Sequence, residues 1–225
     1  MKITSIDVWT VVVPTIPGRV HSSEFVQETE WDQVPKCIIQ LNTDTELCGI
    51  GETGRGIPPE DVLTGGSQLL GRNPESLMLQ DVLGEPGGSG DHYPSIGQGA
   101  VYEAFEMAVF DLVGKAREVP VHALLGGAVR TRVRADYWIG HQTPEDGKRS
   151  VERALEAGFK GVKIKCMLEE PMVERLQAML DVAGPEFKVT VDPNERFYTA
   201  PQAIELAHQL QALGNVEVFE DPIPK

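Results

Sequence analysis

From Val133 to the last residue, short apolar runs with strand character alternate with longer segments of helical spacing. Strands that alternate with helices of this length are typical of βαβ units, which form a parallel sheet. We therefore expect a parallel α/β arrangement in this half of the chain. The expected strands are 134–139, 161–166, 188–191 and 216–219, and the helices between them are 144–157, 170–182 and 200–213.

The first 54 residues have a different pattern, in which β-rich runs are joined by short connections. Short connections favour antiparallel pairing of neighbouring strands. The segment 16–33 is polar and long for a connection, and such loops are usually functional lids or disordered. We expect an antiparallel meander of strands at 3–13, 37–41 and 47–51, with Asn42–Asp44 as the second turn.

Residues 59–125 are helical in character, and the strongest helix is expected over 98–117. Val101, Phe105, Ala108 and Leu112 follow helical spacing and form its apolar face. A glycine-rich loop is expected at 84–90. The nearby Gly-x-Gly at 97–99 is not a dinucleotide fingerprint, because no strand precedes it and a tyrosine takes the last glycine position.

Composition excludes several classes of partner. The 225 residues carry 34 Asp and Glu against 20 Lys and Arg, a formal net charge of −14, and no run of basic residues, so we expect no nucleic-acid binding. The apolar run 8–13 is too short to span a membrane and has no signal-peptide cleavage site, so no membrane association is expected. The three cysteines form no C-x-x-C pair, which favours a reduced, cytoplasmic setting.

Three ionisable residues recur at the ends of the expected parallel strands. Lys165, Asp192 and Glu220 are separated by 27 and 28 residues, about one βαβ unit of roughly 30 residues each. The carboxyl ends of parallel strands share one edge of the sheet, where α/β proteins place their chemistry. The period therefore indicates a functional site.

Side-chain alternation along these strands adds a fourth charged residue. Val162 and Ile164 should face the covering helices, with Lys163 and Lys165 on the opposite side. Buried charge is costly unless it is paired or bound to a metal. The alternative is that the lysines line a solvated face and that Asp192 or Glu220 caps a helix.

Several motifs resemble the enolase superfamily, of the mandelate racemase and muconate-lactonizing type. The strand-end motifs that carry the resemblance are Lys163-Ile164-Lys165, Asp192-Pro193-Asn194 and Glu220-Asp221-Pro222. Upstream, the similarity lies in Gly49–Thr53, Met107–Ala116, Val119–Val121 and Leu124–Gly127. The resemblance covers essentially the whole chain.

The resemblance implies an α+β capping domain over 1–127, followed over 128–225 by the first four βα units of a TIM-type barrel of the modified (β/α)7β form. It also implies a Mg²⁺ ion held by Asp192 and Glu220, whose charge stabilises the enediolate formed when a base removes the proton α to a substrate carboxylate. The expected partner is thus a small-molecule carboxylate, and homo-oligomers are usual in this family.

Lys165 is the candidate base and Lys163 its helper, which could also contact the substrate carboxylate. Asn194 is a candidate for binding the substrate or a ligand, with a helix cap as the alternative. Arg55 and His21, from the two elements that resemble the family's mobile loops, could each contact the substrate or simply be solvated. The same two interpretations, substrate contact or a solvated side chain, apply to His141 at the end of the first barrel strand.

The chain stops after the fourth expected barrel strand, before a third metal ligand and a second catalytic group, so we expect a truncated chain. The strand-end motifs favour a dehydratase of an acid sugar, an aldonate or aldarate, with a 2-keto-3-deoxy acid as product. A racemase, epimerase or cycloisomerase of the same superfamily is the alternative. A non-catalytic fragment or binding module is the alternative from another class.

Overall fold

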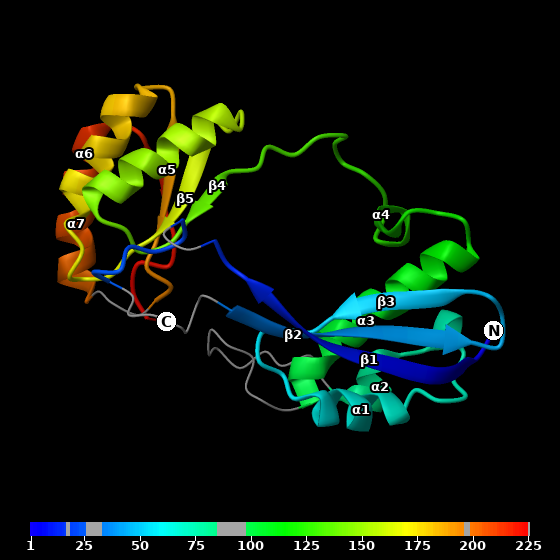
Figure 1. Ribbon diagram of the computed structural model, residues 1–225. Coiled ribbons are helices and arrows are strands. Elements are labelled where there is room, and N and C mark those ends of the chain that lie inside the picture. Colours follow the sequence, from blue (N-terminus) through cyan, green and yellow to red (C-terminus); the bar gives the residue numbers. More distant parts are fainter. Residues whose placement is uncertain (17–18, 26–32, 85–97, 196–198, 225) are drawn as a thin grey trace. The chain divides into compact units, whose positions relative to one another are not determined.

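The chain forms two compact units, each with its own sheet and its own core (Figure 1). The structure is a computed structural model, and it describes residues 1–16, 19–25, 33–84, 98–195 and 199–224. The first unit contains Met1–Pro14 and Gln33–Thr131, and the second contains Thr15–Asp32 and Arg132–Lys225. The domain boundary expected at 127/128 stays a prediction.

The first unit is built on a three-stranded antiparallel sheet in the order β1-β2-β3. Its strands are β1 Ile3–Pro14, β2 Gln33–Thr43 and β3 Cys48–Glu52. On β2 the buried side chains alternate, as Cys37, Ile39 and Leu41 face the core. The expected meander is confirmed. The turn is displaced, however, because Asn42 and Thr43 continue to pair within the strands.

Among the described residues of this unit, the helical segments are α1 Pro59–Ser67, η1 Pro74–Ser76, α2 Leu79–Leu83, α3 Gln98–Ala116 and α4 Val121–Leu124. Helix α3 ends within one residue of its expected position. Its apolar residues at 101, 105, 108 and 112 are all buried. The expected glycine-rich segment after Gly84 lies outside the described residues.

Helix α3 lies unusually close to the edge strand β3, because two glycines remove the side chains between them. A Cβ on Gly49 or Gly51 would lie 2.0 Å from a backbone oxygen of α3. Asp111 of α3 accepts a hydrogen bond from the Ile50 N–H at 2.9 Å, and Lys115 donates to the Cys48 carbonyl at 2.9 Å. The helix therefore satisfies backbone groups of a strand edge that would otherwise be open.

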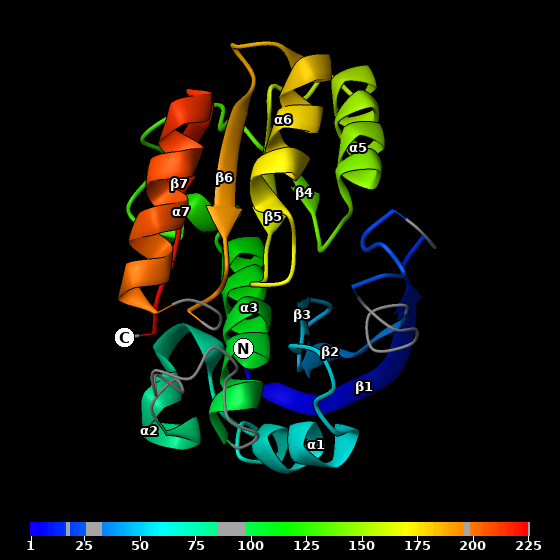
Figure 2. The same cartoon turned by 90° about the vertical axis from the view of Figure 1, so that its left-hand side faces the viewer.

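The second unit contains a four-stranded parallel sheet in the order β4-β5-β6-β7, with three helices on one face (Figure 2). Its elements are β4 Tyr137–Ile139, α5 Pro144–Glu156, β5 Gly161–Lys165, α6 Met172–Ala183, β6 Lys188–Asp192, α7 Ala200–Leu213 and β7 Val216–Phe219. The expected βαβ series is thus confirmed. The first strand is three residues shorter than expected, because its ladder pairing with β5 begins only at Tyr137, and β5 ends one residue before the expected Cys166.

The two faces of the parallel sheet differ as the alternation predicts. Val162, Ile164, Val189 and Val191 are fully buried in the core beneath the helices. Residues one position away along the strands point to the opposite face, where functional groups can collect. No helix in the described part of the chain is both long and apolar enough to cross a membrane.

Candidate active site at the carboxyl ends of the parallel strands

The strand-end residues are brought together by the register of the parallel sheet. Lys165 on β5 is paired in register with Asp192 on β6. Glu220 follows the last residue of β7, and its N–H donates to the Val191 carbonyl at 2.8 Å, which keeps it beside β6. Local hydrogen bonding therefore places all three residues at one edge, as the 27- and 28-residue separations predict.

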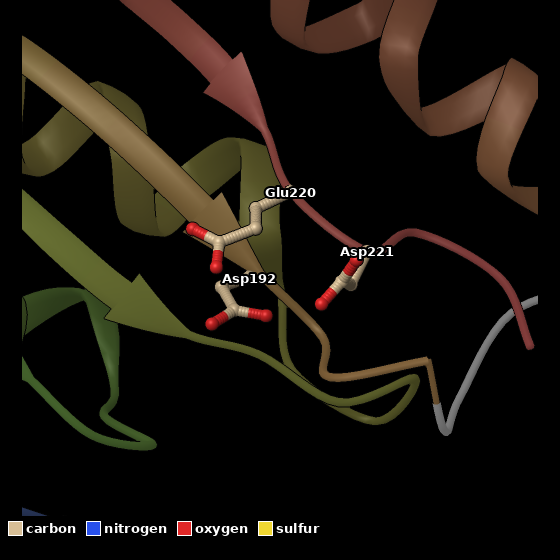
Figure 3. A group of neighbouring side chains, drawn as sticks. All are labelled: Asp192, Glu220 and Asp221. Atoms are coloured by element: carbon tan, nitrogen blue, oxygen red, sulfur yellow. The ribbon is translucent and has the colours of Figure 1, made fainter. Parts of the chain in front are cut away.

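Three carboxylates gather at this edge (Figure 3). One oxygen from each of Asp192, Glu220 and Asp221 can be chosen so that all three atoms lie within 4.8 Å of one another. Oxygen ligands of this kind suit Mg²⁺, which also keeps waters or substrate oxygens in its shell. The donor set therefore fits the implied ion. The sequence predicts only Asp192 and Glu220 as metal ligands, and Asp221 enters it only as part of the Glu-Asp-Pro motif.

Both lysines of β5 pair with these carboxylates. Lys165 Nζ donates to Asp192 Oδ2 at 2.5 Å, and Lys163 Nζ lies 2.9 Å from the same oxygen. Lys163 also donates to both oxygens of Glu220 at 2.8 Å. The alternative of a merely solvated lysine face does not describe these side chains, since both are part-buried and paired.

The surroundings of Asp192 and Lys163 favour the ionised form of each side chain. Burial opposes the charge of Asp192, but hydrogen bonds from Lys165, Lys163 and the Asn194 N–H outweigh it and lower the pKa of Asp192. Burial likewise opposes the charge of Lys163, but Glu220 and Asp192 outweigh it and raise its pKa above the ordinary value. Lys163 is therefore a cation at neutral pH.

Asn194 supports the cluster from the loop after β6. Its backbone N–H donates to Asp192 Oδ1 at 2.9 Å, and its side-chain amide donates to Oδ2 at 3.4 Å. Asn194 and Glu195 both have positive φ angles, of 55° and 58°. The Glu195 N–H donates to the Asp221 carbonyl at 2.8 Å, which joins the two carboxylate-bearing loops.

His21 belongs to a segment that is docked at the end of β4. Its Nδ1 accepts a hydrogen bond from the His141 N–H at 2.9 Å, and the two imidazole rings are stacked with centroids 5.5 Å apart. A Cβ on Gly140 would lie 2.3 Å from the His21 ring, so the docking requires glycine there. The sequence did not reveal this contact, because the two partners are 120 residues apart.

Ser22 and Asp146 anchor the same segment. The Ser22 hydroxyl donates a very short hydrogen bond to Asp146, and the Ser22 N–H donates to the His141 carbonyl at 2.8 Å. Arg55 lies in the other compact unit, in an exposed turn after β3. Substrate contacts by His21 and Arg55 stay predictions.

Comparisons with known proteins show which families and folds this chain is similar to. The family model of the enolase C-terminal domain-like family matches residues 146–225. Arabinonate dehydratase of Saccharolobus solfataricus is 33% identical over 123 residues, which cover 52% of this chain and 32% of the dehydratase. N-succinyl-L-Arg/Lys racemase of Bacillus cereus is 22% identical over 99% of this chain and 60% of its own length.

Solved structures match across both units. The L-Ala-D/L-Glu epimerase of Bacillus subtilis, in a substrate-liganded complex, has a TM-score of 0.81 at 21% identity, covering 99% of this chain and 62% of the epimerase. An isomerase of Streptomyces coelicolor has a TM-score of 0.73 at 27% identity, and the match covers 99% of this chain and 60% of the isomerase. The chain thus spans less than two thirds of the length of these relatives.

The antiparallel α+β unit and the partial parallel barrel, with carboxylates at successive strand ends, define the architecture of enolase-type proteins. Residues 146–225 match the enolase C-terminal domain-like family, and most of the chain is similar to enzymes of the mandelate racemase and muconate-lactonizing type.

Proposed function

We propose that this protein abstracts the proton α to the carboxylate of a small molecule, in a Mg²⁺-dependent reaction, with Lys165 as the base. The observation that carries the proposal is the convergence of Lys165 with Asp192, Glu220 and Asp221 at one sheet edge. A base beside a carboxylate cluster that suits Mg²⁺ is the combination that this chemistry needs.

Asp192 and Glu220 would hold the ion, and Asp221 is close enough to contribute a third oxygen. Bound Mg²⁺ would supply positive charge next to the substrate carboxylate, where negative charge develops as the α-proton leaves. Lys163 remains cationic and adds a second positive charge there. Asn194 orients Asp192 through its two hydrogen bonds.

For the overall reaction we favour dehydration of an acid sugar, an aldonate or aldarate. The α-proton passes to Lys165, the β-hydroxyl leaves with a proton as water, and the resulting enol becomes a 2-keto-3-deoxy acid. The 33% identity with arabinonate dehydratase supports this choice, and D-galactonate dehydratase of Variovorax paradoxus is 27% identical over 82% of this chain.

The second candidate is a racemase or epimerase, which shares the first proton transfer but returns a proton to the other face of the same carbon. Its support is the similarity to the N-succinyl-L-Arg/Lys racemase over nearly the whole chain. A cycloisomerase is a further alternative, since chloromuconate cycloisomerase of Cupriavidus pinatubonensis is 28% identical over 84% of this chain.

Isotope exchange in D₂O tests the proposal on the natural gene product. With Mg²⁺ present, aldonates, aldarates, N-acylamino acids and dipeptides are screened for α-proton exchange and for release of a 2-keto acid. We expect exchange in the wild type and its loss in Lys165→Ala. The matched control is Lys160→Ala, an exposed lysine before the opposite end of β5.

The outcomes separate the candidates. Exchange with release of a 2-keto-3-deoxy acid supports the dehydratase, whereas exchange that only inverts the α-carbon supports a racemase or epimerase. Exchange that survives in Lys165→Ala contradicts the assignment of the base. Absence of both α-proton exchange and 2-keto-acid release with every acid contradicts the proposed activity and favours the non-catalytic binding module.

A further inference from the structure

The strands β4 and β5 end next to each other, and the backbone groups beyond their last residues need partners. Ladder hydrogen bonds stop at Ile139 and Ile164, the last register pair of these strands. Buried N–H and C=O groups are almost always satisfied in proteins. Two buried charged side chains of this unit, Arg175 and Glu170, supply several of these partners.

Arg175 of α6 connects the two strand ends through their carbonyls. Its side chain is fully buried. Nη2 donates to the Gly140 carbonyl at 2.6 Å, and Nη1 donates to the Lys165 carbonyl at 2.9 Å. One rigid guanidinium thus spans the end of β4 and the backbone of the proposed base.

Glu170 connects the same two strand ends through their amides. It accepts from the Met167 N–H at 3.0 Å and from the Gln142 N–H at 3.3 Å, and it lies 2.6 Å from His141 Nδ1. Glu170 is also the buried ion-pair partner of Arg175. The Arg175–Glu170 pair therefore forms a clamp with bonds to donors and acceptors of both strand ends.

Stability alone is a weak reason for this arrangement. Burial lowers the pKa of Arg175, with Glu170 acting in the opposite direction, so the charged pair is held against a desolvation penalty. Well-packed apolar residues often replace such pairs without loss of stability. What apolar side chains cannot replace is the set of directional bonds to the Lys165 and Gly140 carbonyls.

We propose that Arg175, held by Glu170, is a positioning residue for Lys165. By fixing the Lys165 carbonyl against the end of β4, the clamp sets where the side chain of the base begins. This inference rests on the proposed function, because it assigns a consequence for proton transfer. It places no contact between the clamp and the substrate or the metal-binding carboxylates.

The test uses the natural gene product with the double substitution Arg175→Met/Glu170→Met, which removes both charges and keeps similar volume. Arg175→Lys keeps the charge without the planar fork. The matched control is Arg153→Met on α5, since Arg153 donates to Ser150 on its own helix rather than to a strand end. Thermal unfolding and Mn²⁺ affinity are measured beside the kinetics of α-proton exchange.

We expect the double variant to fold and to bind Mn²⁺ like the wild type, with little change in KM. Its kcat should fall by about tenfold to a hundredfold, because small misplacements of a catalytic group cost this much. The kcat of Arg175→Lys should fall less, and that of Arg153→Met should not change. A folded double variant with wild-type kcat overturns the inference.

Hydrogen exchange keeps the two proposals distinguishable. In the double variant, amides of the peptide 161–168 should lose protection while those of α7 keep it. If the wild type catalyses no Lys165-dependent α-proton exchange with any acid, the proposed function alone has failed. Unchanged protection of 161–168 would then overturn the clamp as well, and a local loss would support it.

Discussion

The two sheets of this protein use side-chain alternation for different purposes. In the antiparallel sheet, Cys37, Ile39 and Leu41 face the core, while Trp9 on β1 is 48% exposed. In the parallel sheet, the positions that alternate with the core carry Lys163, and Asp192 ends the neighbouring strand. Alternation thus separates the core from solvent in one sheet, and the core from a face of paired lysines and carboxylates in the other.

The largest expected change in stability comes from substituting Ile164, a core residue next to the proposed base Lys165. Ile164→Ala should lower the free energy of unfolding of the second unit by about 2–5 kcal/mol, because this fully buried side chain leaves a cavity. Lys163→Ala should lower it by less, since Lys163 is 32% exposed and its buried partner Asp192 keeps the ion pair with Lys165. Denaturant unfolding measures both variants. Equal losses of unfolding free energy would contradict the division of the sheet into a core face and a face of paired charges.

The contact between α3 and β3 is a second test, in the antiparallel unit. Gly51→Ala should cost about 1–3 kcal/mol, because its Cβ would overlap the Ala104 carbonyl. Gly54→Ala is the matched control, since a Cβ there meets no atom within 4 Å. Thermal unfolding compares the two, and a Gly51→Ala variant as stable as its control would show that α3 can move away at no cost.

Docking of the segment 19–25 on the parallel unit should be sensitive to one methyl group. Gly140→Ala places a Cβ against the His21 ring and the Val20 carbonyl, so the segment should move away from β4. We expect faster amide exchange at His21 and Ser22, with Gly54→Ala again as the control. Unchanged protection of both amides would contradict the docking.

Acidification should have the smallest effect, a weakening of the docking of the Ser22 segment when Asp146 becomes protonated. Burial opposes its charge, but the hydrogen bond from Ser22 and the charge of Arg149 outweigh this and lower its pKa. Because the folded pKa lies below the ordinary value of about 3.8, docking is fully favoured above that pH and weakens as the pH falls through the folded pKa. NMR shifts of Ser22 between pH 6 and pH 3 measure this, and Asp146→Asn should mimic the acid state at pH 6.

Local patterns were sufficient to predict most elements of the parallel unit. Helix α7 and strand β7 have the bounds expected from periodicity, and Lys165, Asp192 and Glu220 meet as their spacing predicts. The failures are at element ends, where β4 begins at Tyr137, three residues later than expected, because backbone pairing with β5 starts only there.

Long-range partners could not be predicted from the sequence. Arg175 has the appearance of an ordinary helix charge, and only the fold brings it to the Gly140 carbonyl, 35 residues away. His21 and Ser22 lie in a polar connection without periodicity, and their partners at 141 and 146 follow from tertiary docking. Spacing identifies residues that share a sheet edge, but it carries no information on which loops fold back onto it.

Divalent-cation affinity tests directly whether the carboxylates at the edge of the parallel sheet hold a metal. Mn²⁺ binding to the natural gene product is measured by electron paramagnetic resonance in the wild type, Asp192→Asn and Glu220→Gln. Glu217→Gln, an exposed change on β7, is the control. We predict that each site variant weakens binding by at least about tenfold, or about 1.4 kcal/mol, while the control matches the wild type. Wild-type affinity in both site variants would contradict the account.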